Sequence, residues 1–170
     1  MQISEGVVVG LEMKELLQTM PQTGVVEWIG VRQARREPIQ ILDQAEVNEQ
    51  GLVGDRYNGP ADGDRMITLV QQEHISAVAS ILAQDSIAPA LLRRNIVVSG
   101  INLQALKKNE MQIGDAVLFV TGNCPPCSRM EENLGPGGYN AMRGHGGVTA
   151  RVVSGGTIKI GSQIRLMPAK

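Results

Sequence analysis

The chain has 170 residues, of which 42% are hydrophobic and 19% are charged, and its formal net charge is −1. This balance is typical of one globular domain that needs no disulfide scaffold, and it excludes a disordered chain. The near-zero net charge and the scarcity of aromatic residues argue against nucleic acid and against an anionic membrane surface as partners.

The first eleven residues, MQISEGVVVGL, lack the basic segment and the cleavage site of an export signal. No apolar run approaches the roughly 18 residues that a transmembrane helix needs. The two cysteines, Cys124 and Cys127, lie three positions apart. Together these features predict a cytoplasmic protein whose thiols stay reduced.

Residues 1–22 are expected to form an N-terminal extension with a short helix within 11–20 that ends at Pro21, and residues 23–170 are expected to form a single domain. A longer helix is predicted over 71–84, because apolar residues recur there at three- and four-residue spacing. Runs rich in Val and Ile predict strands at 25–31, 66–70, 95–99, 116–121, 148–153, 158–161 and 163–167. The expected fold class is therefore mainly β (α+β), a β-barrel with a few peripheral helices.

Two long stretches, 50–64 and 122–147, are predicted to be irregular, and stretches of that length are usually functional. The second contains the segment NCPPCSRME. Ser128 and Glu131 have the spacing of a capping box, which predicts Ser128 as the N-cap of a short helix. Cys127 would then lie just outside the helix N-terminus beside Arg129, and both features favour the thiolate. A stiff loop that presents one thiolate suits a metal ligand or a sulfur carrier.

Other interpretations of the cysteines remain open at this point. Both could be small buried apolar residues. A zinc site with His145 as a third ligand would still lack its fourth, since His74 falls in the predicted helix. A thioredoxin-type dithiol is disfavoured, because the cysteines come late in a strand-rich chain.

Arginines precede one predicted strand and follow another. Arg93 and Arg94, followed by Asn95, stand before the strand at 95–99, and Arg32, Arg35 and Arg36 follow the strand at 25–31. Such guanidinium groups can bind phosphate or carboxylate bidentately, or can simply be solvated.

Four segments make the sequence resemble the MOSC family, named for the C-terminal domain of molybdenum cofactor sulfurases. They are GLVGDRY (51–57), RRNIVVSGINL (93–103), IGDAVLFVTGNCPPCSRME (113–131) and GGTIKIGSQI (155–164). RGHGGVTARV (143–152) is similar to a segment of small stand-alone bacterial members. The resemblance covers the chain from about residue 23 onward and implies a β-barrel decorated by helices.

The resemblance also implies a cofactor site. Cys127 would coordinate molybdenum as the catalytic residue, and Arg93 and Asn95 would contact the pterin cofactor. Arg32 corresponds more loosely to a basic residue that meets the cofactor phosphate. Arg94 and Arg129 are further candidates for cofactor binding because of their places beside Arg93 and Cys127.

Two functions follow as hypotheses from the resemblance. The protein could bind molybdenum cofactor and reduce N-hydroxylated compounds, with electrons from an external donor protein, since no flavin or iron–sulfur motif is visible. Alternatively, it could carry a persulfide or the cofactor without turnover and work with a sulfur-transfer partner. No segment resembles a pyridoxal-phosphate-binding domain, so we expect no mobilisation of sulfur from cysteine by this chain.

Overall fold

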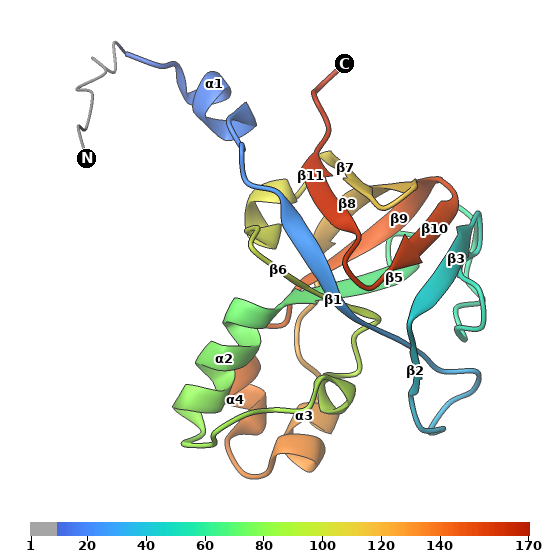
Figure 1. The fold of residues 1–170 in the computed structure, drawn as a ribbon. Helices are drawn as coiled ribbons and strands as arrows, with labels where there is room; N and C mark the ends of the chain where they lie inside the picture. The colour runs from blue at the N-terminus through green and yellow to red at the C-terminus, as the bar shows by residue number, and fades with distance from the viewer. Residues whose placement is uncertain (1–9) are drawn as a thin grey trace.

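The computed structural model describes residues 10–170 (Figure 1). Its helices are α1 (Met13–Gln18), α2 (Gln72–Ile81), α3 (Ser128–Leu134) and α4 (Gly138–Met142), with two 3-10 turns, η1 (Pro89–Leu92) and η2 (Leu103–Leu106). Its strands are β1 (Gly24–Val31), β2 (Gln40–Leu42), β3 (Gln44–Asn48), β4 (Gly51–Leu52), β5 (Ile67–Gln71), β6 (Ile96–Ser99), β7 (Glu110–Ile113), β8 (Ala116–Asn123), β9 (Val148–Ser154), β10 (Gly156–Lys159) and β11 (Gln163–Leu166).

Within residues 10–170, seven strands close into a barrel in the order β1-β11-β7-β8-β9-β5-β6. Closure occurs because β11 pairs with β7 on one side and with the start of β1 on the other, where Gly24 lies opposite Ile164. The pair β5–β6 is parallel, and the other pairs in the ring are antiparallel. Strand β2 extends the sheet from the end of β1, and β10, β3 and β4 form a smaller sheet.

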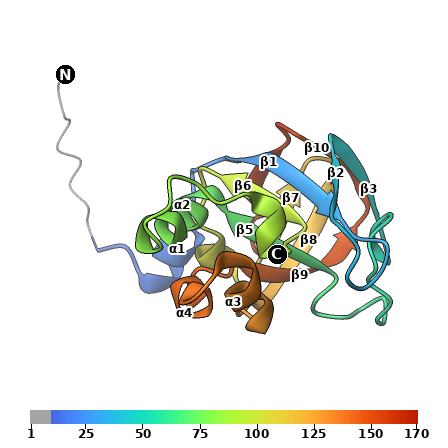
Figure 2. The ribbon, with the colours of Figure 1, turned by 90° about the horizontal axis from the view of Figure 1, so that it is seen from below.

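The barrel interior is aliphatic, as the scarcity of aromatic residues requires. Alternating side chains of the strands point inward and are fully buried, among them Ile29, Leu69, Ile96 and Leu118. A second apolar cluster lies between β5, β6 and helices α2, α3 and α4, and includes Ile75, Val78, Met130 and Met142. These three helices gather at one end of the barrel (Figure 2), so they and the strand ends frame the segment that contains the cysteines.

The sequence predictions for the strands are confirmed within two or three residues at each end, and the helix predicted over 71–84 is α2. Strands β2, β3, β4 and β7 were not predicted, because they are short and their residues are mostly polar or mixed. The stretch 122–147 contains two helices: α3, the short helix that was predicted to begin near Ser128, and α4, which was not predicted. Helix α4 has the weak helix former Gly138 at its start, and it is held by burial of Ala141 and Met142.

The N-terminal extension contains one helix where a helix was expected. Helix α1 has no buried residue, and Gln18 contacts the domain through a hydrogen bond from its Nε2 to Asn109 Oδ1, 3.1 Å long. Residues 1–9 of the predicted extension lie outside the described residues. Among residues 10–170, no helix is long and apolar enough to cross a membrane.

Candidate functional site

The CPPC loop (residues 124–127) connects β8 to α3 and separates two different cysteines. Cys124 is 3% exposed, and its backbone N–H donates to the carbonyl of Gly147, 2.9 Å away. Cys127 is exposed. Cys124 is therefore a small buried residue, as one of the open interpretations held for both cysteines. Cys127 is not buried, and it is the accessible thiol of the loop.

The predicted capping box is wrong. Helix α3 begins at Ser128, the residue at its N-cap is Cys127, and the cap makes no side-chain hydrogen bond. The Glu131 carboxylate instead accepts hydrogen bonds from the backbone N–H groups of Gly137 and Tyr139, at 2.8 and 2.9 Å. These two bonds hold the pKa of Glu131 below its ordinary value. Glu131 thus connects α3 to the start of α4, because the chain turns back within reach of its side chain.

Four arginines from separate segments form an arginine cluster: Arg32 after β1, Arg56 after β4, Arg93 after η1 and Arg129 in α3. Arg32, Arg93 and Arg129 line one cavity of about 340 Å³. The structure thus brings together Arg32, Arg93 and Arg129, three of the residues that the sequence offered as candidates, and adds Arg56.

The charges of the arginine cluster affect one another. Partial burial lowers the pKa of Arg93, the positive charges of Arg129 and Arg56 lower it further, and the Cys127 thiol acts in the opposite direction. Burial also lowers the pKa of Arg32, followed by the charges of Arg93 and Arg56, while Asp55 opposes them. The effect of Cys127 on the pKa of Arg93 indicates that the two side chains are close enough for their charges to interact.

Few carboxylates balance the arginine cluster. Asp55 accepts a hydrogen bond from the backbone N–H of Arg32, 3.0 Å long. Glu132 forms an exposed ion pair with Arg129 at 3.7 Å, and within residues 10–170 no other ion pair involves the cluster. The site therefore carries surplus positive charge next to a thiol, an arrangement that suits an anion with a soft metal centre.

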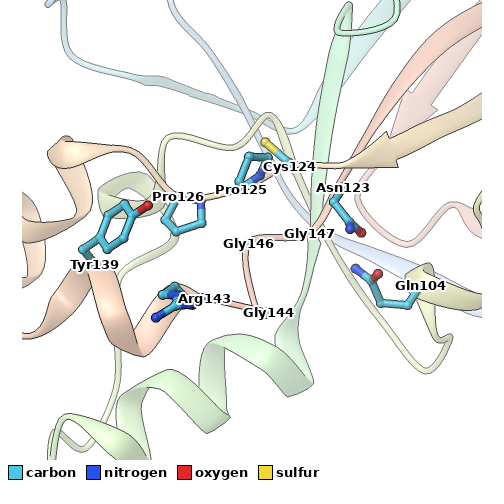
Figure 3. A pocket seen from close by; sticks show the side chains of 10 residues that line it. All are labelled: Gln104, Asn123, Cys124, Pro125, Pro126, Tyr139, Arg143, Gly144, Gly146 and Gly147. Carbon is cyan, nitrogen blue, oxygen red and sulfur yellow. The ribbon is translucent and has the colours of Figure 1, made fainter.

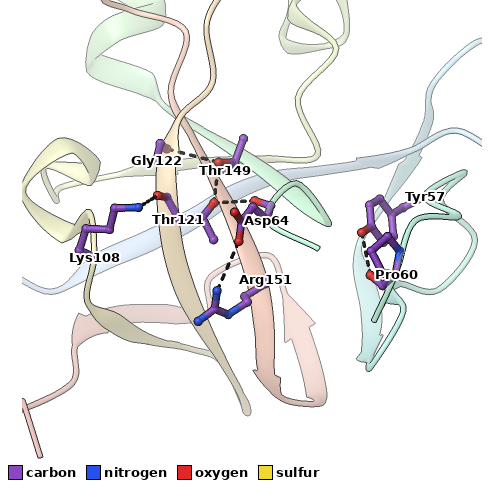
Figure 4. Close-up of polar contacts among 8 residues, drawn as sticks. All are labelled: Tyr57, Pro60, Asp64, Lys108, Thr121, Gly122, Thr149 and Arg151. Atoms are coloured by element: carbon purple, nitrogen blue, oxygen red, sulfur yellow. Dashed lines mark hydrogen bonds and ion pairs between the residues drawn. The ribbon is translucent and has the colours of Figure 1, made fainter. Parts of the chain in front are cut away.

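The loop at 53–66, which carries Arg56, is fixed to the barrel at its far end (Figure 4). The Thr121 hydroxyl donates to the carbonyl of Asp64 at 2.5 Å, and Arg151 pairs with the Asp64 carboxylate at 3.3 Å. Within the loop, the Tyr57 hydroxyl donates to the carbonyl of Pro60 at 2.8 Å. A segment without regular structure can thus hold Arg56 in a defined place.

Arg94 has different surroundings from Arg93. It is 6% exposed, and its guanidinium donates to the backbone carbonyls of Gly146, Leu92, Cys124 and Pro125. Arg93 has φ of 60°, a left-handed conformation that reverses the chain between η1 and β6. The sequence left open whether these arginines bind an anion or are simply solvated. Arg94 is not solvated, because its side chain is hydrogen-bonded to η1, to the CPPC loop and to the segment before β9.

Asn95 also makes hydrogen bonds within the protein. Its Oδ1 accepts from the backbone N–H and the hydroxyl of Thr68, at 3.0 and 3.1 Å, and its Nδ2 donates to the carbonyl of Gly30 at 3.2 Å. It therefore fixes the ends of β1 and β5 relative to each other, which positions Arg32. Arg35 and Arg36 are exposed in the turn before β2, and Arg36 lines the cavity of the arginine cluster.

The two histidines lie together, and neither lines the cavity of the arginine cluster. The rings of His74 and His145 meet edge to face with centroids 5.2 Å apart, and Nδ1 of His145 lies 3.1 Å from the carbonyl of Ala141. Among residues 10–170, no group of three His, Cys, Asp or Glu side chains is placed to hold a metal ion. The zinc interpretation has no ligand set in this part of the chain.

Sequence reasoning missed Arg56. It lies in the segment GLVGDRY, which was one of the four that carried the family resemblance, yet no strand or cysteine stands next to it in sequence. Its role depends on β4 and the following loop, which bring it to Arg32. The motif GLVGDRY thus contained Arg56, but only the strand topology shows that Arg56 lies near the other arginines.

Comparisons with known proteins agree with this fold. The family model described as MOSC domain matches residues 36–165. Among solved structures, the chain is similar to YuaD of Bacillus subtilis, with a TM-score of 0.75 and 19% identity over 87% of this chain and 97% of that one. It is also similar to YiiM of Geobacillus stearothermophilus, with a TM-score of 0.70 and 17% identity over 85% and 75% of the two chains. No curated protein sequence matches the chain.

Proposed function

This chain belongs to the MOSC domain family, and from that membership we propose that it binds a molybdenum cofactor at Cys127 and the arginine cluster. We further propose that it reduces N-hydroxylated compounds with electrons from an external donor protein. The observation that carries the proposal is an exposed thiol in the electrostatic reach of arginines that lack an equal number of carboxylate partners.

The residues of this site fit such a cofactor. A thiolate is the ligand that a soft metal centre prefers, and guanidinium groups are the partners that a phosphate prefers. Burial, followed by repulsion among the arginines, lowers the pKa of Arg32 and Arg93, and an anion bound between them would relieve the repulsion. The donor set thus matches both ends of a phosphate-bearing cofactor.

Each residue then has a distinct part in binding. Cys127 would hold the metal, while Arg93, Arg32, Arg56 and Arg129 would hold the phosphate. Arg94 and Asn95 would act indirectly, by fixing the CPPC loop and the strand ends through the bonds described above. The cofactor, when bound, would supply the redox chemistry that no side chain of the site provides.

The test is to purify the protein from a host that makes the cofactor and to measure bound molybdenum by elemental analysis. Cys127→Ser should lose the metal and any turnover of N-hydroxylated substrates driven by dithionite and a viologen dye, because a hydroxyl is a poor substitute for a thiolate. Cys124→Ser is the matched control, and it should keep both, since Cys124 is buried away from solvent.

A loaded protein that shows no turnover across hydroxylamines, amidoximes and N-hydroxylated bases would contradict the reductase proposal. In that case the carrier function takes its place, because the exposed Cys127 thiol is also accessible to a sulfur-transfer partner. Transfer of labelled sulfane sulfur from a cysteine desulfurase to Cys127 would then be the measurement. Absence of molybdenum from the wild-type protein would contradict cofactor binding itself.

A further inference from the structure

A second pocket lies against the CPPC loop, and it shares no lining residue with the cavity of the arginine cluster. Its volume is about 280 Å³, near the roughly 300 Å³ at which small-molecule pockets begin. The glycine loop (residues 144–147) runs through the middle of this pocket, with Tyr139, Pro126 and Arg143 on one side and Asn123 and Gln104 on the other (Figure 3).

The charge of this pocket is positive. Its lining contains Arg143 and no Asp or Glu. Arg143 is exposed, and its guanidinium has only a long contact of 3.4 Å with the neutral amide of Asn140 within the described residues. At the opposite edge, Lys107 donates to Asn123 Oδ1 at 3.1 Å, which adds a second cation beside the pocket. The pocket therefore attracts an anion that the protein itself does not supply.

The glycine loop adds backbone donors to the same pocket. Within residues 10–170, the N–H groups of Gly144, Gly146 and Gly147 have no hydrogen-bond acceptor, although Gly146 and Gly147 are buried residues. Buried backbone N–H groups without a partner are rare, so these donors call for a ligand or an ordered water. Gly144 and Gly147 have φ of 80° and 87°, the left-handed region that favours glycine.

The backbone also explains why the loop is made of glycine. A Cβ at Gly146 would lie 2.1 Å from the carbonyl oxygen of Cys124, and one at Gly147 would lie 1.9 Å from that of Leu69. The carbonyl of Gly146 accepts from Arg94 Nε at 2.7 Å, which holds the loop in place. The donors of the glycine loop are therefore fixed before any ligand binds.

We propose that this pocket binds a small phosphate monoester. Arg143 and the N–H groups of the glycine loop would bind the phosphate, because several convergent donors suit its three terminal oxygens. The Tyr139 ring and the amides of Asn123 and Gln104 would contact the organic part. This site goes beyond the proposed cofactor site, since none of its residues belongs to the arginine cluster.

The test is calorimetric titration of the protein with adenosine 5′-monophosphate as the probe, with adenosine and inorganic phosphate as comparisons, at fixed ionic strength. The monophosphate should bind more tightly than either comparison. Arg143→Gln should weaken its affinity by roughly tenfold or more, because a charge-assisted bond is lost. Arg165→Gln removes the same charge from exposed β11 and should leave the affinity unchanged.

Other outcomes would overturn the proposal. They include equal affinity of wild type and Arg143→Gln, and affinity for the monophosphate no greater than that for adenosine or inorganic phosphate. Arg93→Gln shows which site binds the monophosphate. If Arg93→Gln still binds it, the pocket is supported. If Arg93→Gln loses binding and Arg143→Gln keeps it, the monophosphate binds at the arginine cluster. Equal melting temperatures of the Arg143 and Arg165 variants would show that the difference in binding does not come from misfolding.

Discussion

At the residue scale, two neighbouring arginines have different roles: Arg94 stabilises the fold, and Arg93 is proposed to bind the cofactor. Arg94 satisfies backbone carbonyls in three segments, and most of these bonds are buried. Arg94→Met would leave buried acceptors without donors, each of which costs about 1–3 kcal/mol. We expect the free energy of unfolding to fall by about 2–4 kcal/mol, measured by chemical denaturation.

Arg93→Ala is the counterpart of that variant, since no hydrogen bond of the Arg93 side chain occurs within the described residues. It should change the free energy of unfolding by no more than about 0.5 kcal/mol. It should weaken cofactor binding by about 1.5–3 kcal/mol through loss of a charge-assisted bond. Stability lost in Arg93→Ala and kept in Arg94→Met would show that the two roles have been assigned the wrong way round.

At the element scale, Glu131 connects the short helices α3 and α4 through its bonds to the N–H groups of Gly137 and Tyr139. These bonds favour the ionised carboxylate, so its pKa in the folded protein lies below the ordinary value of 4.5. The stabilisation is therefore fully present above pH 4.5 and is lost as the pH falls through the lowered pKa of the folded state. Glu131→Gln should melt at a lower temperature than wild type at pH 7.

That difference between Glu131→Gln and wild type should shrink as the pH falls below 4.5, and thermal melting followed by circular dichroism measures it. Glu132→Gln is the matched control, because Glu132 is adjacent and forms only an exposed ion pair with Arg129. Exposed pairs contribute about 0–1 kcal/mol, so the control should melt close to wild type. A Glu131→Gln difference that stays constant from pH 7 to pH 3 would exclude the carboxylate as its source.

At the scale of the whole molecule, the barrel depends on the seam where β1 meets β11. Gly24 lies opposite Ile164 in this seam, and a Cβ there would lie 2.5 Å from Ile101 Cγ2 and 2.9 Å from the carbonyl oxygen of Ser99. Gly24→Ala should destabilise the protein by about 1–3 kcal/mol, because the start of β1 would have to shift away from the end of β6, where Ser99 and Ile101 lie. Chemical denaturation followed by circular dichroism is the measurement.

Gly122→Ala gives the matched comparison, since Gly122 lies in β8 and a Cβ there would have no heavy atom within 4 Å. This variant should keep wild-type stability or gain up to about 1 kcal/mol, because alanine restricts the unfolded chain more than glycine does. If both variants lost the same stability, the cost at Gly24 would reflect strand glycines in general and not the clash with Ser99 and Ile101.

The sequence by itself determined where most barrel strands lie, because runs of β-branched residues between glycine and proline turns are local signals. It also determined helix α2, whose apolar stripe is visible within one segment, and the family resemblance that the domain match confirms. It did not determine β2, β3, β4 or β7, which are short and of polar or mixed composition, nor the pairing of β10 with β3, which lie far apart in sequence.

The tertiary structure alone decided the composition of the candidate site. Arg32, Arg56, Arg93 and Arg129 meet because barrel closure and the fixed loop at 53–66 bring four separate segments to one end. The same folding separates Arg93 from Arg94, which adjacency in sequence had joined, and buries Cys124 while leaving Cys127 exposed. Burial and charge proximity are sums over contacts between distant segments, and no local pattern of residues encodes them.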